Sequence, residues 1–477
     1  MLKFGLVTLG CDKNTVDSER YLADLVAHGA EPVQDLRDAD VVLVNTCGFI
    51  DAAKAESIEA IVDAARLKDE GGVKAVFAIG CMVERHKDEL LEALPEVDVF
   101  LGNSETDRLV PELVERGLLG GSLVEHPGVR LFSGDVPHVR YLKISEGCDH
   151  GCAFCAIPLM RGKHRSFAVD DLVREAQLLE AQGAREINLV AQDLAHYGRD
   201  RRDGNALPEL LEALIRETSI PWIRNMYLYS TGITPRLLEV IAANPRIVRW
   251  LDTPMQHGSD AVLSRMRRPE RQKTIRERLA RYREIVPDLA VRTSVIVGFP
   301  GETEDDFLTL CDFLEEMQFD RVGVFTYSPQ EGTRAWTMED DVAESIKQER
   351  KERIEELQRS ITASRYERFL GRDARVLVER RGETADQWIC RAPWQADDID
   401  GLTHVSISES ALRDGSAKAI TPGSMLDVVV NQVVDDYDFA ATWRGTLEAP
   451  ATAAPVRSGR SLPLVGIDTS SAGSFGR

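Results

Sequence analysis

Between residues 139 and 330 the sequence alternates strand-like apolar runs with amphipathic helical patterns. The runs read VRYLKIS, EINLVAQ, WIRNMYLYS, VRWLDTP, VRTSVIVG and RVGVFTYS. Helical patterns lie between them, as at 168–182, 207–217 and 302–317. Repeated strand–helix units predict a parallel sheet with helical crossovers, and six of them fit a partial (β/α)6 barrel. In this architecture the catalytic and ligand-binding residues lie at the carboxyl ends of the strands.

Three closely spaced cysteines follow the first of these strands. Cys148, Cys152 and Cys155 form the pattern C-x3-C-x2-C in EGCDHGCAFC. Three thiolates at this spacing can each bind one iron of a cubane [4Fe–4S] cluster, and the fourth iron then stays open to another ligand. A structural zinc site normally adds a fourth Cys or His, so His150 and His164 keep zinc as an alternative. The barrel pattern favours iron, because a zinc knuckle needs no barrel.

A second set of three cysteines is dispersed over the N-terminal part of the chain. Cys11, Cys47 and Cys81 each end an apolar run: FGLVTLGC, DVVLVNTC and AVFAIGC. Helical patterns at 17–28 and 52–67 separate the runs, which predicts another parallel α/β sheet. Ligands of such sheets bind at the carboxyl ends of the strands, where the three cysteines can converge. The sequence therefore predicts a second three-cysteine cluster.

The charge of the chain bears on its partners. Its 477 residues include 58 Lys and Arg against 79 Asp and Glu, so the net charge is −21. A chain this acidic is poorly suited to bare nucleic acid, whose binding depends on neutralising phosphates. No apolar run reaches the ~18–20 residues that span a bilayer, and the start, MLKFGLVTLGC, lacks the layout of a signal peptide. We therefore expect a cytoplasmic protein with no membrane and no specific DNA partner.

Two further features are expected to be structural. Cys311 and Cys390 are isolated, and a buried thiol outside a metal site behaves as a small apolar side chain. The segment 265–283 holds nine Lys and Arg against two Glu, which favours a solvated helix face over a contact with RNA.

The C-terminal part of the sequence changes character twice. Residues 339–369 are charged and helical in pattern, as a connector helix would be. From 371 to 445, short β-like runs (ARVLVER, HVSIS and MLDVVVNQVV) predict a small antiparallel barrel. This module has eight Lys and Arg against thirteen Asp and Glu, whereas an RNA-binding barrel is usually basic. Residues 446–477 are rich in Ala, Pro, Ser and Gly, which predicts a disordered tail.

The two cysteine sets, the barrel and the terminal β module together resemble the methylthiotransferases, a branch of the radical S-adenosylmethionine (SAM) superfamily. Within that branch the chain is most similar to the ribosomal protein methylthiotransferases of the RimO type. The matching segments are LGCDKNTVDSER, NTCGFIDAAKAESI, CDHGCAFCAIPLMRGKHRS, TPMQHGSDAVLSRMRR, VIVGFPGETEDDF and VGVFTYSPQEGT. Relatives that modify tRNA tend to have GCQMN around the first cysteine, where this chain has GCDKN. Asp12 departs from the proline common in the RimO type, and DYDFAA only partly follows the usual ending of the barrel.

The resemblance implies a domain organisation and a set of cofactors. The implied parts are an N-terminal cluster domain at 1–116, a radical SAM barrel with its connector helix at 134–370, a TRAM-like β-barrel at 371–445 and a tail at 446–477. One [4Fe–4S] cluster would be held by Cys11, Cys47 and Cys81, and a second by Cys148, Cys152 and Cys155. SAM would bind the open iron of the second cluster, and Gln192, at a strand end, is a candidate contact for it. No catalytic side chain is assigned beyond the clusters.

The resemblance also implies the reaction and the partners. An aspartate of small-subunit ribosomal protein twelve would be methylthiolated at its β-carbon to 3-methylthioaspartate. The electron would come from a reductase or a flavodoxin-type donor, and the enzyme would act as a monomer. Since ribosomal proteins are basic, the acidic β module can steer such a substrate by charge complementarity.

Two alternatives stay open at this point, the second of them from another class of protein. A tRNA methylthiotransferase that modifies an adenosine next to the anticodon would need a basic terminal barrel, and the net charge of −5 there argues against it. A non-catalytic iron–sulfur or zinc protein, acting as a redox sensor or binding module, would leave the barrel pattern unexplained.

Overall fold

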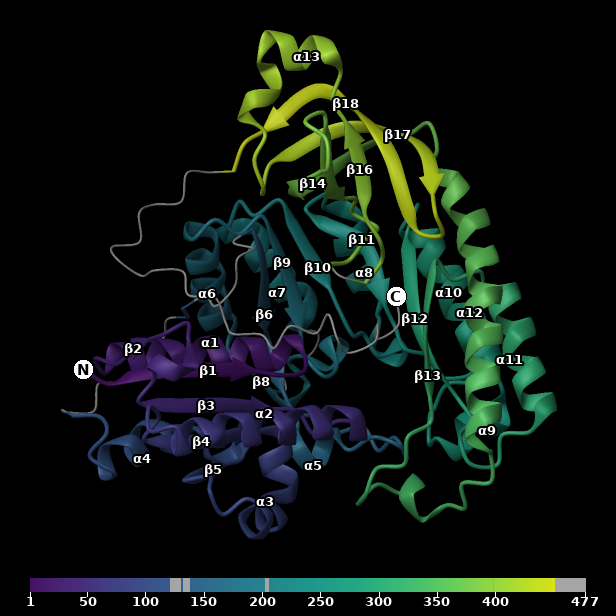
Figure 1. Cartoon of the computed structure of the whole chain (residues 1–477). Helices are drawn as coiled ribbons and strands as arrows, with labels where there is room; N and C mark the ends of the chain where they lie inside the picture. Colours follow the sequence, from purple (N-terminus) through teal and green to yellow (C-terminus); the bar gives the residue numbers. More distant parts are fainter. Residues whose placement is uncertain (121–129, 132–137, 202–205, 398, 451–477) are drawn as a thin grey trace.

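Three main sheets and the helices around them make up the protein (Figure 1). The computed structural model describes residues 1–120, 130–131, 138–201, 206–397 and 399–450. Within these ranges no helix is both long and apolar enough to cross a membrane. Most of the predicted tail, from 451 on, lies outside the described residues, and the division at 116, 134, 370 and 445 stays a prediction.

The N-terminal sheet has five parallel strands in the order β2-β1-β3-β4-β5. The strands are β1 (Lys3–Thr8), β2 (Glu31–Pro32), β3 (Val41–Thr46), β4 (Ala75–Gly80) and β5 (Val99–Leu101). The helices are α1 (Asp12–Ala27), α2 (Asp51–Asp69), α3 (Cys81–Ala93) and α4 (Leu109–Glu115). β3 and β4 are buried along their whole length, because separate apolar clusters cover the two faces of the sheet. The predicted parallel α/β sheet is confirmed.

Phe77, in the middle of β4, is fully buried and tests how much this core contributes to stability. We expect Phe77→Ala to lower the local free energy of unfolding by about 3–5 kcal/mol, because it removes apolar contacts and leaves a cavity. Hydrogen exchange of peptides that cover β4 measures this directly, whereas one melting curve would mix several units. Leu91→Ala, at a side chain 51 % exposed, is the control and should stay within about 0.5 kcal/mol. Equal protection in both variants would contradict the assignment of this core.

The second sheet has six parallel strands in the order β13-β12-β11-β10-β9-β6. The strands are β6 (Val139–Lys143), β9 (Glu186–Val190), β10 (Trp222–Asn225), β11 (Ile247–Asp252), β12 (Ala290–Val297) and β13 (Arg321–Thr326). The helices are α6 (Val169–Ala181), α7 (Ala206–Glu217), α8 (Pro235–Ala243), α9 (Asp260–Arg265), α10 (Gln272–Ile285) and α11 (Glu304–Met317). One strand lies in each predicted run, and the partial (β/α)6 barrel is confirmed.

The loop after β6 carries two short strands and a short helix: β7 (Ser145–Glu146), α5 (Ile157–Arg161) and β8 (Arg165–Ser166). β7 and β8 form an antiparallel pair that closes the base of the loop. This loop holds the C-x3-C-x2-C motif at the carboxyl end of β6.

The C-terminal part contains the predicted helix and the predicted small barrel. The helix is α12 (Glu344–Tyr366), which packs along α11 and β13 (Figure 1). The barrel strands are β14 (Asp373–Arg381), β15 (Gln387–Arg391), β16 (Thr403–Ser406), β17 (Met425–Val434) and β18 (Asp438–Glu448), with α13 (Glu409–Asp414) between β16 and β17. The barrel is closed in the order β14-β15-β16-β18-β17. It differs from the prediction in one pair, β16–β18, which is parallel, because β18 returns to complete the barrel.

The small barrel packs against the beginnings of the strands of the second sheet. A shared apolar cluster contains Val139, Trp222 and Ala290, each the first residue of its strand, together with Leu377 and Met425 of the small barrel. In a parallel sheet the strand beginnings lie at the edge opposite the strand ends. The small barrel therefore leaves the edge that carries the cysteine loop uncovered.

Candidate functional site

The three N-terminal cysteines stand at one edge of the N-terminal sheet. Cys47 and Cys81 directly follow β3 and β4, and Cys11 stands three residues beyond β1. Because β1, β3 and β4 are neighbours in the sheet, the thiols share one edge, as the sequence predicted. A Cβ atom on Gly10 would lie 2.9 Å from Cys47 Sγ, and Gly10 has a φ of +90°. Only glycine suits this position, where the loops after β1 and β3 approach each other.

Asn14 connects all three strand ends. Its Nδ2 donates to the carbonyl oxygens of Leu9 at 2.8 Å and Thr46 at 3.0 Å. Its own backbone carbonyl accepts a hydrogen bond from Asn45 Nδ2 at 3.1 Å. Its Oδ1 lies 3.6 Å from Cys81 Sγ. One buried side chain thus fixes the loops that carry the three cysteines.

The second cysteine set lies in the loop after β6. Its three members are half-buried: Cys148, Cys152 and Cys155. The loop begins at Gly147, whose φ is +80° and where a Cβ atom would collide with the carbonyl of Lys163. The start and the end of the loop therefore pack backbone against backbone, which presents the thiols at the carboxyl edge of the barrel.

Arg268 reaches Cys152 from the segment that follows α9. Its Nη1 lies 3.7 Å from Cys152 Sγ, and its guanidinium stacks 3.8 Å from the centre of the Tyr229 ring. Its Nη2 donates to Glu270 Oε1 at 3.1 Å. His150, two residues from Cys148 and Cys152, stacks on the same Tyr229 ring at 3.9 Å. Together these groups support the loop and place a cation beside one thiol.

The basic segment 265–283 is therefore not a uniform solvated face. Arg267, Lys273 and Arg281 are exposed, as expected, but the prediction is wrong for Arg268, which is 4 % exposed. Its burial follows from the partners it finds, because a carboxylate and a thiol face it. Arg276 is paired with Glu316 of α11 at 2.6 Å. These pairings are internal to the barrel.

Burial raises the pKa of several of these thiols. The pKa of Cys47 and of Cys148 is raised to about 11, and that of Cys155 to about 12. Burial also raises the pKa of Cys81. At neutral pH these groups are thiols, so a metal that binds them must displace their protons.

The donor sets fit a cluster of several irons better than one zinc ion. Zn–S bonds of about 2.3 Å place two sulfurs at most about 4.6 Å apart. Within the described part of the chain, no three cysteine sulfurs lie within 4.8 Å of one another. Of the two candidate zinc histidines, His164 Nε2 lies 3.0 Å from Ser166 Oγ. His150 Nε2 lies 2.7 Å from Asp193 Oδ2, in a group with His196 that could hold a metal ion but contains no cysteine. Three spread thiols without a fourth ligand match a [4Fe–4S] cluster with an open iron.

Gln192 stands at the end of β9, close to the cysteine loop. Its Nε2 donates to Glu146 Oε1 at 3.0 Å. Its Oε1 is buried and has no hydrogen-bond partner among the residues that the structure describes. Buried acceptors are normally paired, so this oxygen suits a ligand with donor groups, as SAM has. The contact between Gln192 and SAM stays a prediction.

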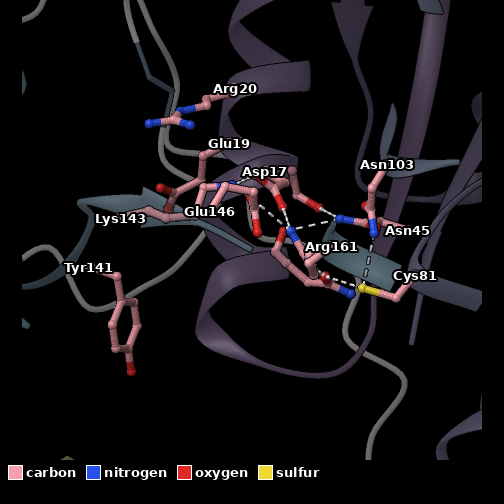
Figure 2. Close-up of polar contacts among 12 residues, drawn as sticks. Asp17, Glu19, Arg20, Asn45, Cys81, Asn103, Tyr141, Lys143, Glu146 and Arg161 are labelled. Carbon is pink, nitrogen blue, oxygen red and sulfur yellow. Dashed lines mark hydrogen bonds and ion pairs between the residues drawn. The ribbon is translucent and has the colours of Figure 1, made fainter. Parts of the chain in front are cut away.

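The two cysteine edges meet at α5. Cys81 packs against Ala156 and Met160 of the other cysteine loop. Asn103 Nδ2 donates to the carbonyl of Met160 at 2.8 Å and lies 3.3 Å from Cys81 Sγ. Figure 2 shows Asn103 and Cys81 beside Arg161, the last residue of α5. The two sets thus belong to one composite site.

Sequence analysis missed three residues of this site: Asn14, Asn103 and Arg268. Asn14 does lie near a cysteine in the sequence, which is the only local signal it has. Arg268 is hidden among eight other basic residues, and Asn103 is 22 residues from the cysteine it contacts.

Comparison with known proteins agrees with this arrangement. Residues 3–102 match the family described as Uncharacterized protein family UPF0004, and residues 142–314 match the Radical SAM superfamily. The chain is 44 % identical over 467 residues to the ribosomal protein uS12 methylthiotransferase RimO of Anaeromyxobacter sp. (strain Fw109-5), covering 97 % of this chain and 98 % of that relative. The protein of the same name from Geobacter sulfurreducens is 40 % identical, with 90 % and 98 % covered.

Solved structures show a similar fold. The radical SAM methyltransferase TsrM from Kitasatospora setae, with tryptophan and aza-SAM bound, matches at a TM-score of 0.52 and 14 % identity. The match covers 68 % of this chain and 73 % of TsrM. At this identity the likeness concerns the fold alone, whereas the curated relatives match nearly from end to end. The chain belongs to the RimO family of ribosomal protein uS12 methylthiotransferases, within the radical SAM superfamily.

Proposed function

We propose that this protein transfers a methylthio group to the β-carbon of an aspartate in ribosomal protein uS12, giving 3-methylthioaspartate. The observation that carries the proposal is the pair of three-cysteine sets that meet at α5. The family name supports the substrate. The β-carbon bears a C–H bond that side-chain acids and bases do not activate, so a radical route with its own sulfur source is needed.

The six cysteines are the proposed cluster ligands. Cys148, Cys152 and Cys155 would hold the [4Fe–4S] cluster that binds SAM, and Cys11, Cys47 and Cys81 would hold the other. When bound, the clusters and SAM supply the electron, the carbon radical and the sulfur that the reaction needs. The protein's own contribution is to keep the two sets adjacent and shielded, through Asn14 at one edge and Arg268 at the other.

The proposed partners follow from the charge and from the chemistry. The substrate would be uS12, free or on the ribosome, and its basic surface suits a chain of net charge −21. Because the acidic small barrel packs at the strand beginnings, its charge would act at long range rather than at the site. A flavodoxin-type protein or a reductase would deliver the electron, and the enzyme would work as a cytoplasmic monomer. A tRNA substrate is disfavoured, since the small barrel is acidic.

Reconstitution tests this function. Anaerobically reconstituted protein, given SAM, a reductant and purified uS12, should add one methylthio group in place of one hydrogen, located on an aspartate by peptide mass spectrometry. The control is the triple variant of Cys11, Cys47 and Cys81 to alanine, which should leave uS12 unmodified. Modification of anticodon-loop RNA but not of uS12 under these conditions would contradict the proposal.

A further inference from the structure

Arg161 is a buried cation that lies beside Cys81 of the N-terminal cysteine set (Figure 2). It lies six residues beyond Cys155, yet its side chain, 3 % exposed, enters the cysteine edge of the N-terminal sheet. Its Nη1 donates to Asp17 Oδ2 at 2.6 Å, and its Nη2 donates to Asn14 Oδ1. The same Asn14 oxygen lies 3.6 Å from Cys81 Sγ. The guanidinium therefore lies beside a cluster thiol, and Asn14 contacts both groups.

Three other charged side chains face Arg161. Arg161 Nη1 lies 3.2 Å from Glu146 Oε2, and Lys143 donates to that same oxygen at 2.6 Å. Lys143 also donates to Asp17 Oδ1. Two cations and two carboxylates thus form a neutral group beside Cys81, and all four are at least four-fifths buried. Water screens charges at such a place only weakly.

Holding α5 in place does not by itself explain this arrangement. The apolar contacts of Cys81 with Ala156 and Met160, and the bridge through Asn103, already dock α5 on the N-terminal sheet. Burial of a guanidinium carries a large desolvation penalty, and an apolar side chain of similar size would avoid it. The buried guanidinium is explained if the protein needs a positive charge at this position.

We propose that Arg161 is a positioning residue that sets the reduction potential of the cluster at Cys11, Cys47 and Cys81. One-electron reduction of a cluster adds one negative charge to it, and a nearby cation stabilises that charge. Without Arg161, the carboxylates of Asp17 and Glu146 would face Lys143 alone, which leaves a net negative group beside the cluster. The inference rests on the proposed function, since it needs a cluster at each cysteine set. It also means that a residue from the loop that holds the SAM-binding cluster affects the reduction potential of the N-terminal cluster.

Redox titration of the reconstituted full-length protein, followed by electron paramagnetic resonance, tests the inference. The triple alanine variant of Cys148, Cys152 and Cys155 identifies the signal of the N-terminal cluster. At a fixed potential, Arg161→Gln should lower the ratio of reduced to oxidised N-terminal cluster at least tenfold, which is a shift of about 59 mV to more negative potential. Arg161→Lys should keep most of the wild-type potential, because the charge remains. Lys163→Gln, which removes a charge from an exposed position of the same loop, should match the wild type.

Asp17→Asn provides a test of opposite sign. It deletes a negative charge from the same group, so the potential should become less negative. An unchanged reduction potential in Arg161→Gln that holds its N-terminal cluster overturns the inference. A shift in Arg161→Lys as large as that in Arg161→Gln also overturns it, because it would indicate a purely structural role. If Arg161→Gln does not take up the N-terminal cluster, an unchanged potential in Asp17→Asn overturns it instead. Absence of an N-terminal cluster from the wild-type protein would contradict the proposed function, a separate outcome.

Discussion

Replacing Cys148, Cys152 and Cys155 together by alanine should abolish SAM cleavage and halve the iron of the reconstituted protein, from about eight atoms to about four. The effect should be complete rather than partial, because without these thiolates nothing holds the iron that would bind SAM. Iron analysis and chromatography of the cleavage product, 5′-deoxyadenosine, measure the two quantities on the same sample. The N-terminal cluster should stay, since its ligands come from other strands.

The reciprocal variant separates SAM cleavage from methylthiolation. Alanine at Cys11, Cys47 and Cys81 should also leave about four irons, but SAM cleavage should continue while methylthiolation stops. Cys311→Ala is the matched control, because Cys311 is half-buried on α11 and belongs to neither set. It should change neither iron content nor cleavage. Zinc in place of iron, or SAM cleavage that survives the first triple replacement, would contradict the assignment of the clusters.

The second large effect concerns the contact between the two barrels. Glu186 of β9 is fully buried between Arg391 of β15, at 2.5 Å, and Arg224 of β10, at 2.7 Å. Glu186→Gln would leave the buried guanidinium of Arg224 without its counter-charge and would remove one of the carboxylates that face Arg391, so the contact should be weakened by about 3–5 kcal/mol. Hydrogen exchange of peptides that cover β15 measures this loss of stability. Asp288→Asn is the matched control between the same two barrels, because Asp288 and its partner Arg372 are 50 % and 49 % exposed, and such a pair is worth about 0–1 kcal/mol.

The same carboxylate gives the contact a pH dependence. Burial alone would raise the pKa of Glu186, but the charges of Arg391 and Arg224 outweigh burial and lower it to about 2 from an ordinary value of 4.5. A lowered pKa means that the stabilisation is fully present above pH 4.5 and is lost as the pH falls through about 2. The difference between wild type and Glu186→Gln should therefore be constant above pH 4.5 and shrink on acidification. A difference that does not depend on pH over this range would contradict the assignment.

Much of the fold could be predicted because its signals are local. The strand–helix alternation gave both parallel sheets, and the position of Cys11, Cys47 and Cys81 directly after apolar runs placed them at one edge. In a parallel sheet the direction of each strand decides the edge, so three local patterns suffice to predict a convergence. The parallel pairing of β16 with β18 could not be predicted in this way, since it depends on how the barrel closes.

The supporting residues of the site could not be predicted from local patterns. Arg268 contacts Cys152 across 116 residues of chain, and Arg161 contacts Asn14 across 147. Their positions follow from the docking of the N-terminal sheet on the cysteine loop and from the packing of α9. Neither event leaves a periodic signal in the sequence. The charge count suggested a solvated face where the folded protein buries one arginine beside a thiol.

The most direct test of the proposed function is mass spectrometry of ribosomal protein uS12 and of tRNA from cells that lack this chain. The proposal predicts that uS12 loses the methylthio group on its aspartate, that methylthiolated tRNA is unchanged, and that the wild-type chain restores the modification. The triple alanine variant of Cys11, Cys47 and Cys81 should not restore it. Retention of modified uS12 together with loss of methylthiolated tRNA would contradict the proposal.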